Sequence, residues 1–274
     1  MTDFCSTRDL ADQVSDGDKI ALPPDYSGCA MEVAKDLIRA QRRNLHIVGV
    51  PTLGLQSDWL IGAGCVDTVE TAAVTLGEHG LAPRFSDAIK HGTIRIIDAT
   101  CPAIHAALQA AEKGIPFMPV RGIIGSDLDH FRDDWKTINN PFAEDEPIIV
   151  VPAIVPDLAI FHVSVADRDG NAFVGVRREL MVMAHAAKRT LITAEEIVDD
   201  NLMQDPLRAA GTIPGLYIDA VAPAKQGAYP IGMWGGYGPE SQAIGDYVTA
   251  AKTQAGFDAY MAALLADQPT RLAS

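Results

Sequence analysis

A cation, a glycine and a serine follow one short apolar segment near the middle of the chain. Residues 115–120 predict a strand, and the two prolines in it favour an edge strand or one that is irregular at its ends. Arg121 then stands at the carboxyl end of that strand, where open α/β sheets bind ligands, and it could hold a carboxylate by two parallel hydrogen bonds. Ser126 could donate to the same group, and Gly125 would let the backbone approach it closely. The alternatives are a structural ion pair for Arg121 and an ordinary turn for the other two.

A second set of reactive side chains surrounds the start of a predicted helix over residues 101–113. Cys101 lies at its N-terminus, and His105 is one turn further along the same face. Asp98 ends the preceding predicted strand, residues 93–98. A thiol at a helix N-terminus can have a lowered pKa and act as a nucleophile, and a histidine can act as the base. The alternatives are an inert buried thiol, a hydrogen-bonded histidine, and an aspartate that polarises His105 or caps the helix.

Strands and helices alternate along the chain in a pattern that predicts a parallel sheet. Residues 19–22 and 45–50 predict strands with an amphipathic helix over residues 30–43 between them, which makes a β-α-β unit. We therefore expect an α/β fold with a mainly parallel, twisted sheet flanked by helices, formed by a single domain over residues 1–274. The polar residues 122–146 predict an irregular surface excursion. Further predicted strands are residues 146–152, 157–165, 189–193 and 216–221, and further predicted helices are residues 178–188 and 240–266.

Composition and motifs argue against several classes of function. The net charge is −14, so the surface is acidic and disfavours nucleic acid and anionic membranes as partners. We expect no membrane span, because no apolar run approaches the roughly 18–20 residues that a span needs. We also expect no signal peptide. The four cysteines lack metal-binding spacing, so we expect free thiols in the cytoplasm and no metal site. The glycine fingerprints of dinucleotide-binding folds and P-loops, and the Gly-x-Ser-x-Gly elbow, are also missing.

Four blocks of sequence resemble the α (A) subunit of class I coenzyme A transferases, in particular the glutaconate CoA-transferase type. Their order and spacing match over residues 15–260. The first block and the turn within the second are the more specific. The blocks are Gly114-Ile-Pro-Phe-Met-Pro-Val-Arg121 with Gly125-Ser-Asp127, Pro156-Asp-Leu-Ala-Ile-Phe-His162 with Ala166-Asp-Arg-Asp-Gly-Asn-Ala172, Ala187-Lys-Arg-Thr-Leu-Ile-Thr193, and Ile213-Pro-Gly-Leu-Tyr-Ile-Asp-Ala-Val221.

The resemblance implies a two-chain enzyme with a fold of the CoA-transferase type. Such enzymes move CoA from an acyl-CoA to a carboxylic acid, and a glutamate of the β subunit forms a thioester with CoA on the way. That glutamate lies in a Ser-Glu-Asn-Gly-type stretch, which this chain lacks. We therefore expect a partner β subunit in an αβ or α2β2 assembly, acyl-CoA and a small carboxylate as substrates, and no bound cofactor. No catalytic residue is expected in this chain, which would shape the acyl pocket and supply oxyanion donors.

One loop departs from the pattern of the family. The α subunits usually carry Gly-Gly-Phe or a similar sequence after the first strand, and these glycines let N–H groups face the thioester oxygen. Here the loop reads Pro23-Pro-Asp-Tyr-Ser-Gly28, and proline has no N–H to donate. Replacement donors in this loop are the hydroxyls of Tyr26 and Ser27 and the amide of Gly28.

The resemblance leaves other activities open. A related branch contains ring-cleaving CoA-thioester hydrolases of steroid degradation, in which an acidic residue of the α subunit lies just before the helix equivalent to residues 101–113 and takes part in the reaction. That position falls at or near Cys101 here, and Asp98 is the nearest carboxylate. A non-catalytic carboxylate-binding relative of the same fold is a further alternative. A partner chain with the glutamate favours the transferase, and a partner without it favours the hydrolase.

Overall fold

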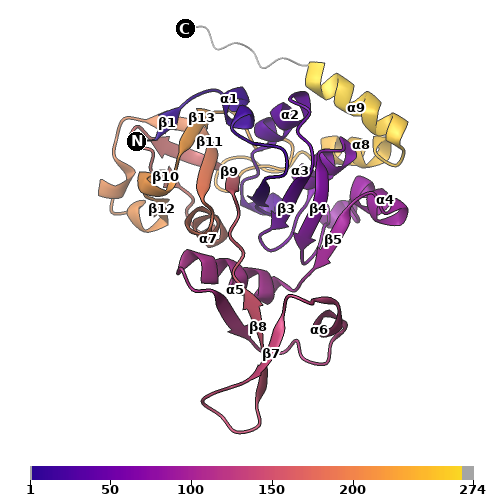
Figure 1. Cartoon of the computed structure of the whole chain (residues 1–274). Helices are drawn as coiled ribbons and strands as arrows, with labels where there is room; N and C mark the ends of the chain where they lie inside the picture. Colours follow the sequence, from indigo (N-terminus) through magenta and orange to yellow (C-terminus); the bar gives the residue numbers. More distant parts are fainter. Residues whose placement is uncertain (1, 267–274) are drawn as a thin grey trace.

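The computed structural model describes residues 2–266 and is built around a ten-stranded sheet (Figure 1). Its main path runs β1-β13-β11-β9-β2-β3-β4-β5, and neighbouring strands on this path are parallel. β10 and β12 form a short antiparallel extension beside β9. The predicted α/β fold with a mainly parallel sheet is confirmed. The strands are β1 (Asp3–Phe4), β2 (Lys19–Leu22), β3 (Leu45–Gly49), β4 (Val66–Thr71), β5 (Arg95–Asp98), β9 (Leu158–Asp167), β10 (Ala172–Phe173), β11 (Arg189–Val198), β12 (Thr212–Ile213) and β13 (Ala220–Pro223).

The direction of strand addition reverses beside β2. From β2 the chain adds β3, β4 and β5 on one side, and β9, β11 and β13 lie in that order on the other side. Where strand order reverses in a parallel sheet, the connections from the carboxyl ends of neighbouring strands leave in opposite directions and open a crevice. A ligand site is therefore expected beside the carboxyl ends of β2 and its neighbours.

Helices cover both faces of the sheet, and alternate residues of each strand contribute to two separate cores. Ile20 and Ile47 pack with residues of α1, α2, α3, α8 and α9, whereas Ala21 and Val48 pack with residues of α5 and α7. This division follows because successive side chains of a strand point to opposite faces. Within the described part of the chain, every helix is too short or too polar to span a bilayer. The helices are α1 (Thr7–Asp12), α2 (Met31–Arg39), α3 (Leu55–Gly62), α4 (Pro83–His91), α5 (Cys101–Glu112), α7 (Arg178–Ala186), α8 (Ser241–Ala250) and α9 (Gln254–Ala266), with 3₁₀ turns η1 (Asp25–Ser27), η2 (Gly77–His79), η3 (Leu202–Gln204), η4 (Ala209–Gly211) and η5 (Gly215–Tyr217).

A three-stranded antiparallel sheet projects from the body beyond α5 (Figure 1). It consists of β6 (Phe117–Val120), β8 (Pro147–Pro152) and β7 (Lys136–Asn139), in the order β6-β8-β7, and carries the short helix α6 (Asp127–Phe131). The edge position of β6 is confirmed. However, the expectation that Arg121 follows a strand of the open parallel sheet is wrong, because β6 pairs with β8 of the small sheet.

The projecting region is also more regular than the sequence predicted. α6 and β7 both fall within residues 122–146, which were expected to be irregular. β7 is exposed along its whole length, so its residues show none of the apolar alternation that reveals a half-buried strand. A polar strand of this kind cannot be recognised from periodicity.

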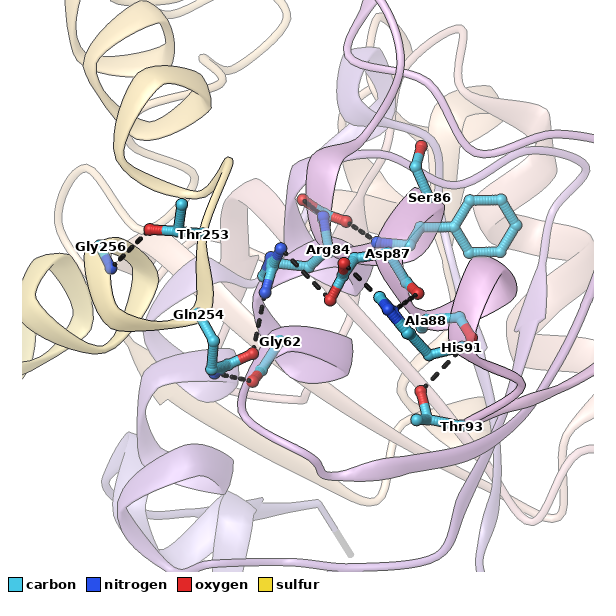
Figure 2. A network of polar contacts seen from close by, with 12 residues as sticks. Gly62, Arg84, Ser86, Asp87, Ala88, His91, Thr93, Thr253, Gln254 and Gly256 are labelled. Carbon is cyan, nitrogen blue, oxygen red and sulfur yellow. Dashed lines mark hydrogen bonds and ion pairs between the residues drawn. The ribbon is translucent and has the colours of Figure 1, made fainter.

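The C-terminal helices are fastened to α3 and α4 by a polar network (Figure 2). Gln254, the first residue of α9, accepts a hydrogen bond from Nη1 of Arg84 at 2.8 Å and donates to the carbonyl of Gly62 at 3.2 Å. The Arg84 side chain is only 2% exposed. In the adjoining core, the Tyr247 hydroxyl donates to Asp58 at 2.6 Å. The network therefore joins α8 and α9 to the helices on this face of the sheet.

Gln254→Ala is expected to lower the free energy of unfolding by about 1–2 kcal/mol, because the buried guanidinium of Arg84 loses an acceptor. Urea unfolding of the full chain measures the change. Gln242→Ala is the matched control, since the Gln242 side chain donates only to Asp246 on the exposed surface of α8. If the two variants unfold at the same urea concentration, the Gln254 contacts do not stabilise the docking of α9.

Candidate active site

A cavity of about 520 Å³ opens at the carboxyl ends of β2, β3 and β4. Residues 24–26 follow β2, residues 52–53 follow β3, and residues 75–79 lie beyond β4. A loop near the C-terminus, residues 231–241, supplies another wall, and most of the lining is apolar. The cavity thus lies beside the reversal of strand order and has the volume and character of a small-molecule site. We refer to it below as the cleft.

The loop after β2 is tied to the centre of the sheet at Gly28. This residue has φ of +89°, which strongly favours glycine, and a Cβ placed there would lie 2.3 Å from the carbonyl oxygen of His162. The amide of His162 donates to the Gly28 carbonyl at 2.7 Å. β9 therefore fixes the loop at the mouth of the cleft, and a side chain at position 28 would force the two backbones apart.

Some hydrogen-bond donors of this loop are engaged and others are not. The Ser27 amide donates to the carbonyl of Pro24, and its hydroxyl donates to the carboxylate of Glu179. Among residues 2–266, no acceptor is found for the amides of Gly28 and Cys29 or for the hydroxyl of Tyr26. Of the three sequence-predicted donor residues, Ser27 is therefore occupied. Tyr26 lines the cleft with its hydroxyl unengaged, whereas Gly28 is buried and does not line it.

Asp25 connects the same loop to the start of α3. Both carboxylate oxygens lie 3.0 Å from the amide of Leu55, the first residue of α3. A Cβ on the neighbouring Gly54 would lie 2.2 Å from this carboxylate, so the close approach requires glycine. Burial raises the pKa of Asp25 to about 7, the charge of Asp58 adds to the shift, and the Leu55 amide opposes it. Asp25 therefore acts as a structural contact to α3 and is not directed at a ligand.

Side chains from α5 and from the start of α7 surround Tyr26 and Ser27 of this loop. The guanidinium carbon of Arg177 lies 5.2 Å from the centre of the Tyr26 ring, and Glu179 in the first turn of α7 accepts the Ser27 hydroxyl. Burial raises the pKa of Tyr26, and the charge of Glu179 raises it further. His105 of α5 is close enough to feel the same carboxylate, but burial has the larger effect and lowers its pKa. His105 is therefore neutral near pH 7.

Cys101 and His105 both lie on α5, which agrees with the predicted helix. Cys101 is the first residue of the helix and is exposed, so the alternative of a buried thiol is wrong. The Cys101 thiol is near enough to contribute to the environment of Tyr26. No hydrogen bond between Cys101 and His105 is present, and a catalytic role for either stays a prediction.

Asp98 does not line the cleft, and it neither contacts His105 nor caps α5, which were the two structural alternatives. Thr100 caps α5 through the amide of Ala103, so Asp98 is not the cap, and its carboxylate accepts the amide of Ala99 at 2.9 Å without reaching His105. Asp98 lines a different cavity, of about 640 Å³, between β5 and the projecting region. A catalytic role for it stays a prediction.

Arg121, Gly125 and Ser126 lie on the projecting region and do not line the cleft. The Arg121 side chain is 73% exposed and pairs with Glu146 at 2.6 Å. The Ser126 hydroxyl donates to the carbonyl of Ile123 at 2.6 Å, and Gly125 has φ of +80°. In this chain alone these residues form an ion pair and a turn, which were the structural alternatives. Their part in substrate binding stays a prediction.

A buried polar network supports the wall formed by the C-terminal loop. His162 is fully buried, with Nδ1 2.8 Å from the Thr193 hydroxyl and Nε2 2.8 Å from the Glu195 carboxylate. Glu195 also accepts the Tyr237 hydroxyl at 2.8 Å and the amide of Gly227 at 3.2 Å. Burial alone would raise the pKa of Glu195, but the bond from His162 and the other donors outweigh it and lower the pKa. His162 is therefore a hydrogen-bonded histidine of the core.

Three polar residues of this site were not found from the sequence. Arg177 and Glu179 flank the start of α7, and Glu195 lies on β11, where it holds the loop of Tyr237. No motif or spacing distinguishes them, because their partners lie far away in the sequence. A sequence signal for Glu179 could have been its place in the first turn of a helix, where carboxylates are common for other reasons.

The fold recurs in a protein of known type. The sequence model for "Coenzyme A transferase" matches residues 6–224. The chain belongs to the coenzyme A transferase family. It superposes on glutaconate coenzyme A-transferase from Acidaminococcus fermentans with a TM-score of 0.88, at 28% identity and with 97% of this chain and 90% of that chain covered.

Curated members of the family narrow this assignment to the α (A) type of chain. The protein is 33% identical over 221 residues to the A subunit of glutaconate CoA-transferase from A. fermentans, covering 74% of this chain and 68% of that protein. It is 29% identical over 269 residues to the A subunit of 3-oxoadipate CoA-transferase from Pseudomonas knackmussii, covering 95% and 93%. It is also 29% identical to the cholesterol ring-cleaving hydrolase IpdA subunit of Mycobacterium tuberculosis, covering 84% and 82%. An uncharacterized protein of Archaeoglobus fulgidus is longer, and the 32% identical match spans 52% of its length.

Proposed function

We propose that this protein is the α subunit of a cytoplasmic acyl-CoA:carboxylate CoA-transferase, in which it forms the acyl-CoA cleft while a β subunit supplies the glutamate nucleophile. The carrying observation is the loop after β2, which lines the cleft with residues 24–26 and in which the following amides of Gly28 and Cys29 have no acceptor among residues 2–266. Buried amides without an acceptor are costly unless a ligand uses them. They are donors for the oxyanion that forms when a carboxylate attacks a thioester.

The carboxylates of the cleft support the idea that the nucleophile comes from another chain. Asp25 is bonded to the first amide of α3, and Glu78 is directed toward Ser241 and His79 at the protein surface. Neither is poised to attack a thioester beside Gly28. The names of the two transferase relatives refer to glutaconate and 3-oxoadipate, both of which are dicarboxylic acids. A dicarboxylic acyl group is therefore the first substrate class to try.

In this scheme the Tyr26 hydroxyl and the Gly28 amide donate to the thioester oxygen, as the Gly-Gly-Phe loop does in the family pattern. The prolines at positions 23 and 24 place no donor in the first half of the loop. The turn η1 ends at Gly28, which adopts positive φ, and the amides of Gly28 and Cys29 have no acceptor among residues 2–266. In this scheme Ser27 holds the loop through Glu179 and does not itself donate to the substrate.

Coexpression with a β subunit tests the function. The complex is expected to release CoA from an acyl-CoA only when a carboxylate acceptor such as acetate is present, and to lose this exchange when the predicted glutamate of the β subunit is changed to glutamine. CoA release and the mass of the β-subunit thioester are the measurements. Exchange that survives the loss of this glutamate would contradict the proposal.

The hydrolase remains the second candidate because of the similarity to the IpdA hydrolase chain and the exposed Cys101 at the start of α5. Hydrolysis needs no acceptor, so CoA release at the same rate with and without acetate would favour it. The same assay therefore separates the two activities.

A further inference from the structure

The guanidinium of Arg177 lines the cleft and forms no ion pair within residues 2–266. Arg177 immediately precedes α7 and lines both the cleft and a small hollow beside it. Its guanidinium carbon lies over the Tyr26 ring at 5.2 Å from the centre. Among residues 2–266 no carboxylate forms an ion pair with it, and its Nε is buried without a hydrogen-bond partner. The stacking on Tyr26 orients the group but supplies no acceptor.

Other partly buried arginines of the chain are neutralised. Arg132 pairs with Glu70 at 3.1 Å, and Arg39 pairs with Asp36 at 2.7 Å. A buried guanidinium nitrogen without an acceptor is destabilising, so the buried Nε of Arg177 points to a missing partner. A carboxylate is the natural partner, because its two oxygens match the two parallel N–H groups of the guanidinium.

Two carboxylates near the loop after β2 have other hydrogen-bond partners. Glu179 accepts the Ser27 hydroxyl, and Asp25 accepts the Leu55 amide. Neither of these two groups forms an ion pair with Arg177. An anion that enters the cleft would therefore find the guanidinium free.

The rest of the wall makes Arg177 the polar end of an apolar pocket. Trp234 packs directly on the turn before Arg177, since a Cβ on Gly175 would lie 2.4 Å from the indole ring. The cleft is continued by apolar side chains from several segments. They are Leu53, Leu76, Ile231, Met233 and Ile244. Such a pocket suits a chain of methylene groups that ends in one negative charge.

We propose that Arg177 binds a carboxylate at the far end of the acyl group, so that the cleft selects CoA thioesters of dicarboxylic acids over monocarboxylic ones of the same length. This inference rests on the proposed function, because it places the acyl group in the cleft. Apolar walls alone would desolvate the terminal carboxylate without compensation, whereas two hydrogen bonds from Arg177 compensate it. Arg177, which lines the cleft, takes the role that the sequence gave to Arg121.

The test compares thioesters that differ only at the far end, glutaryl-CoA with pentanoyl-CoA and adipyl-CoA with hexanoyl-CoA. Kinetics of the αβ complex and equilibrium binding of each thioester are both measured. Arg177→Gln is expected to lower kcat/KM for the dicarboxylic thioesters by roughly 10- to 100-fold, mainly through KM, and to change the monocarboxylic values by less than about threefold. Arg177→Lys should restore part of the loss. Arg178→Gln is the matched control, because the exposed Arg178 donates to the carbonyl of Ala210 outside the cleft.

Three results would overturn the inference. One is an equal loss for both members of each pair, which would assign Arg177 to the CoA moiety or to the fold. Another is a selective loss with Arg121→Gln while Arg177→Gln behaves as wild type. The third is binding of all four thioesters without preference. If the complex binds dicarboxylic thioesters through Arg177 but exchanges no CoA, the inference holds and the proposed transferase activity fails.

Discussion

Replacing Gly28 by alanine is expected to lower the free energy of unfolding by roughly 3–5 kcal/mol and to abolish activity in whatever fraction still folds. An alanine at φ of +89° is strained by about 1–2 kcal/mol. The new Cβ would also lie 2.3 Å from the carbonyl oxygen of His162, an atom held in the middle of the parallel sheet. The loop must therefore move away from β9, and the amides at its tip move with it.

Gly17→Ala separates the backbone strain from the clash with His162 in the loss of unfolding free energy expected for Gly28→Ala. Gly17 has φ of +87°, but nothing lies within 4 Å of a Cβ built on it. Its substitution is expected to cost only the backbone strain, about 1–2 kcal/mol. Urea unfolding of both variants provides the comparison. Equal losses would mean that β9 yields to the new methyl group and that the loop is not fixed by its contact with His162.

Asp25→Asn is expected to change how stability depends on pH. The pKa of Asp25 is raised from 3.8 to about 7 in the folded chain, mainly by burial. Between these values the folded state keeps a proton that the unfolded state releases. The contribution of Asp25 is therefore fully present below pH 4 and is lost as the pH rises through 7, by roughly 4 kcal/mol in total. Asparagine does not titrate, so the variant should gain stability relative to the wild type over this range.

The measurement is the difference in unfolding free energy between variant and wild type at several pH values from 4 to 8. Other carboxylates cancel in this difference, since they are the same in both proteins. Asp67→Asn provides the control, because it removes a carboxylate from an exposed position of β4. A difference for Asp25→Asn that stays flat across the range would show that its carboxyl group ionises as readily in the folded chain as in the unfolded one.

The sequence was sufficient for the architecture because the architecture depends on local patterns. Apolar runs such as residues 45–50 and 157–165 are typical of strands buried on both faces, and β3 and β9 fall on them. The resemblance to the α subunits of the transferases was confirmed for the same reason, since it rested on blocks that form these strands and the turns between them. β6 was recognised as a strand and as an edge, but its sheet was not, because sheet membership depends on partners distant in the sequence.

The site was predicted less well, and the reason is again distance along the chain. Tyr26, Ser27 and Gly28 were identified from one loop; Tyr26 lines the cleft and Ser27 lines the small hollow beside it, whereas Gly28 lines neither. Arg121 was predicted to bind a carboxylate because it follows a strand. That argument holds only for strands of the parallel sheet. Arg177 stands in no motif, and only the folded chain reveals that its guanidinium has no partner.

The wall of the cleft that comes from residues near the C-terminus can change between relatives independently of the sheet. The family model ends at residue 224, yet the cleft continues through residues 231–241 to Ile244 in α8. This wall contributes no strand to the parallel sheet. Substitutions there can reshape the cleft while every strand pairing stays intact. A chain cut after residue 224 would keep all of the matched region and lose one side of the cleft, so a match to the family does not by itself determine the shape of this cavity.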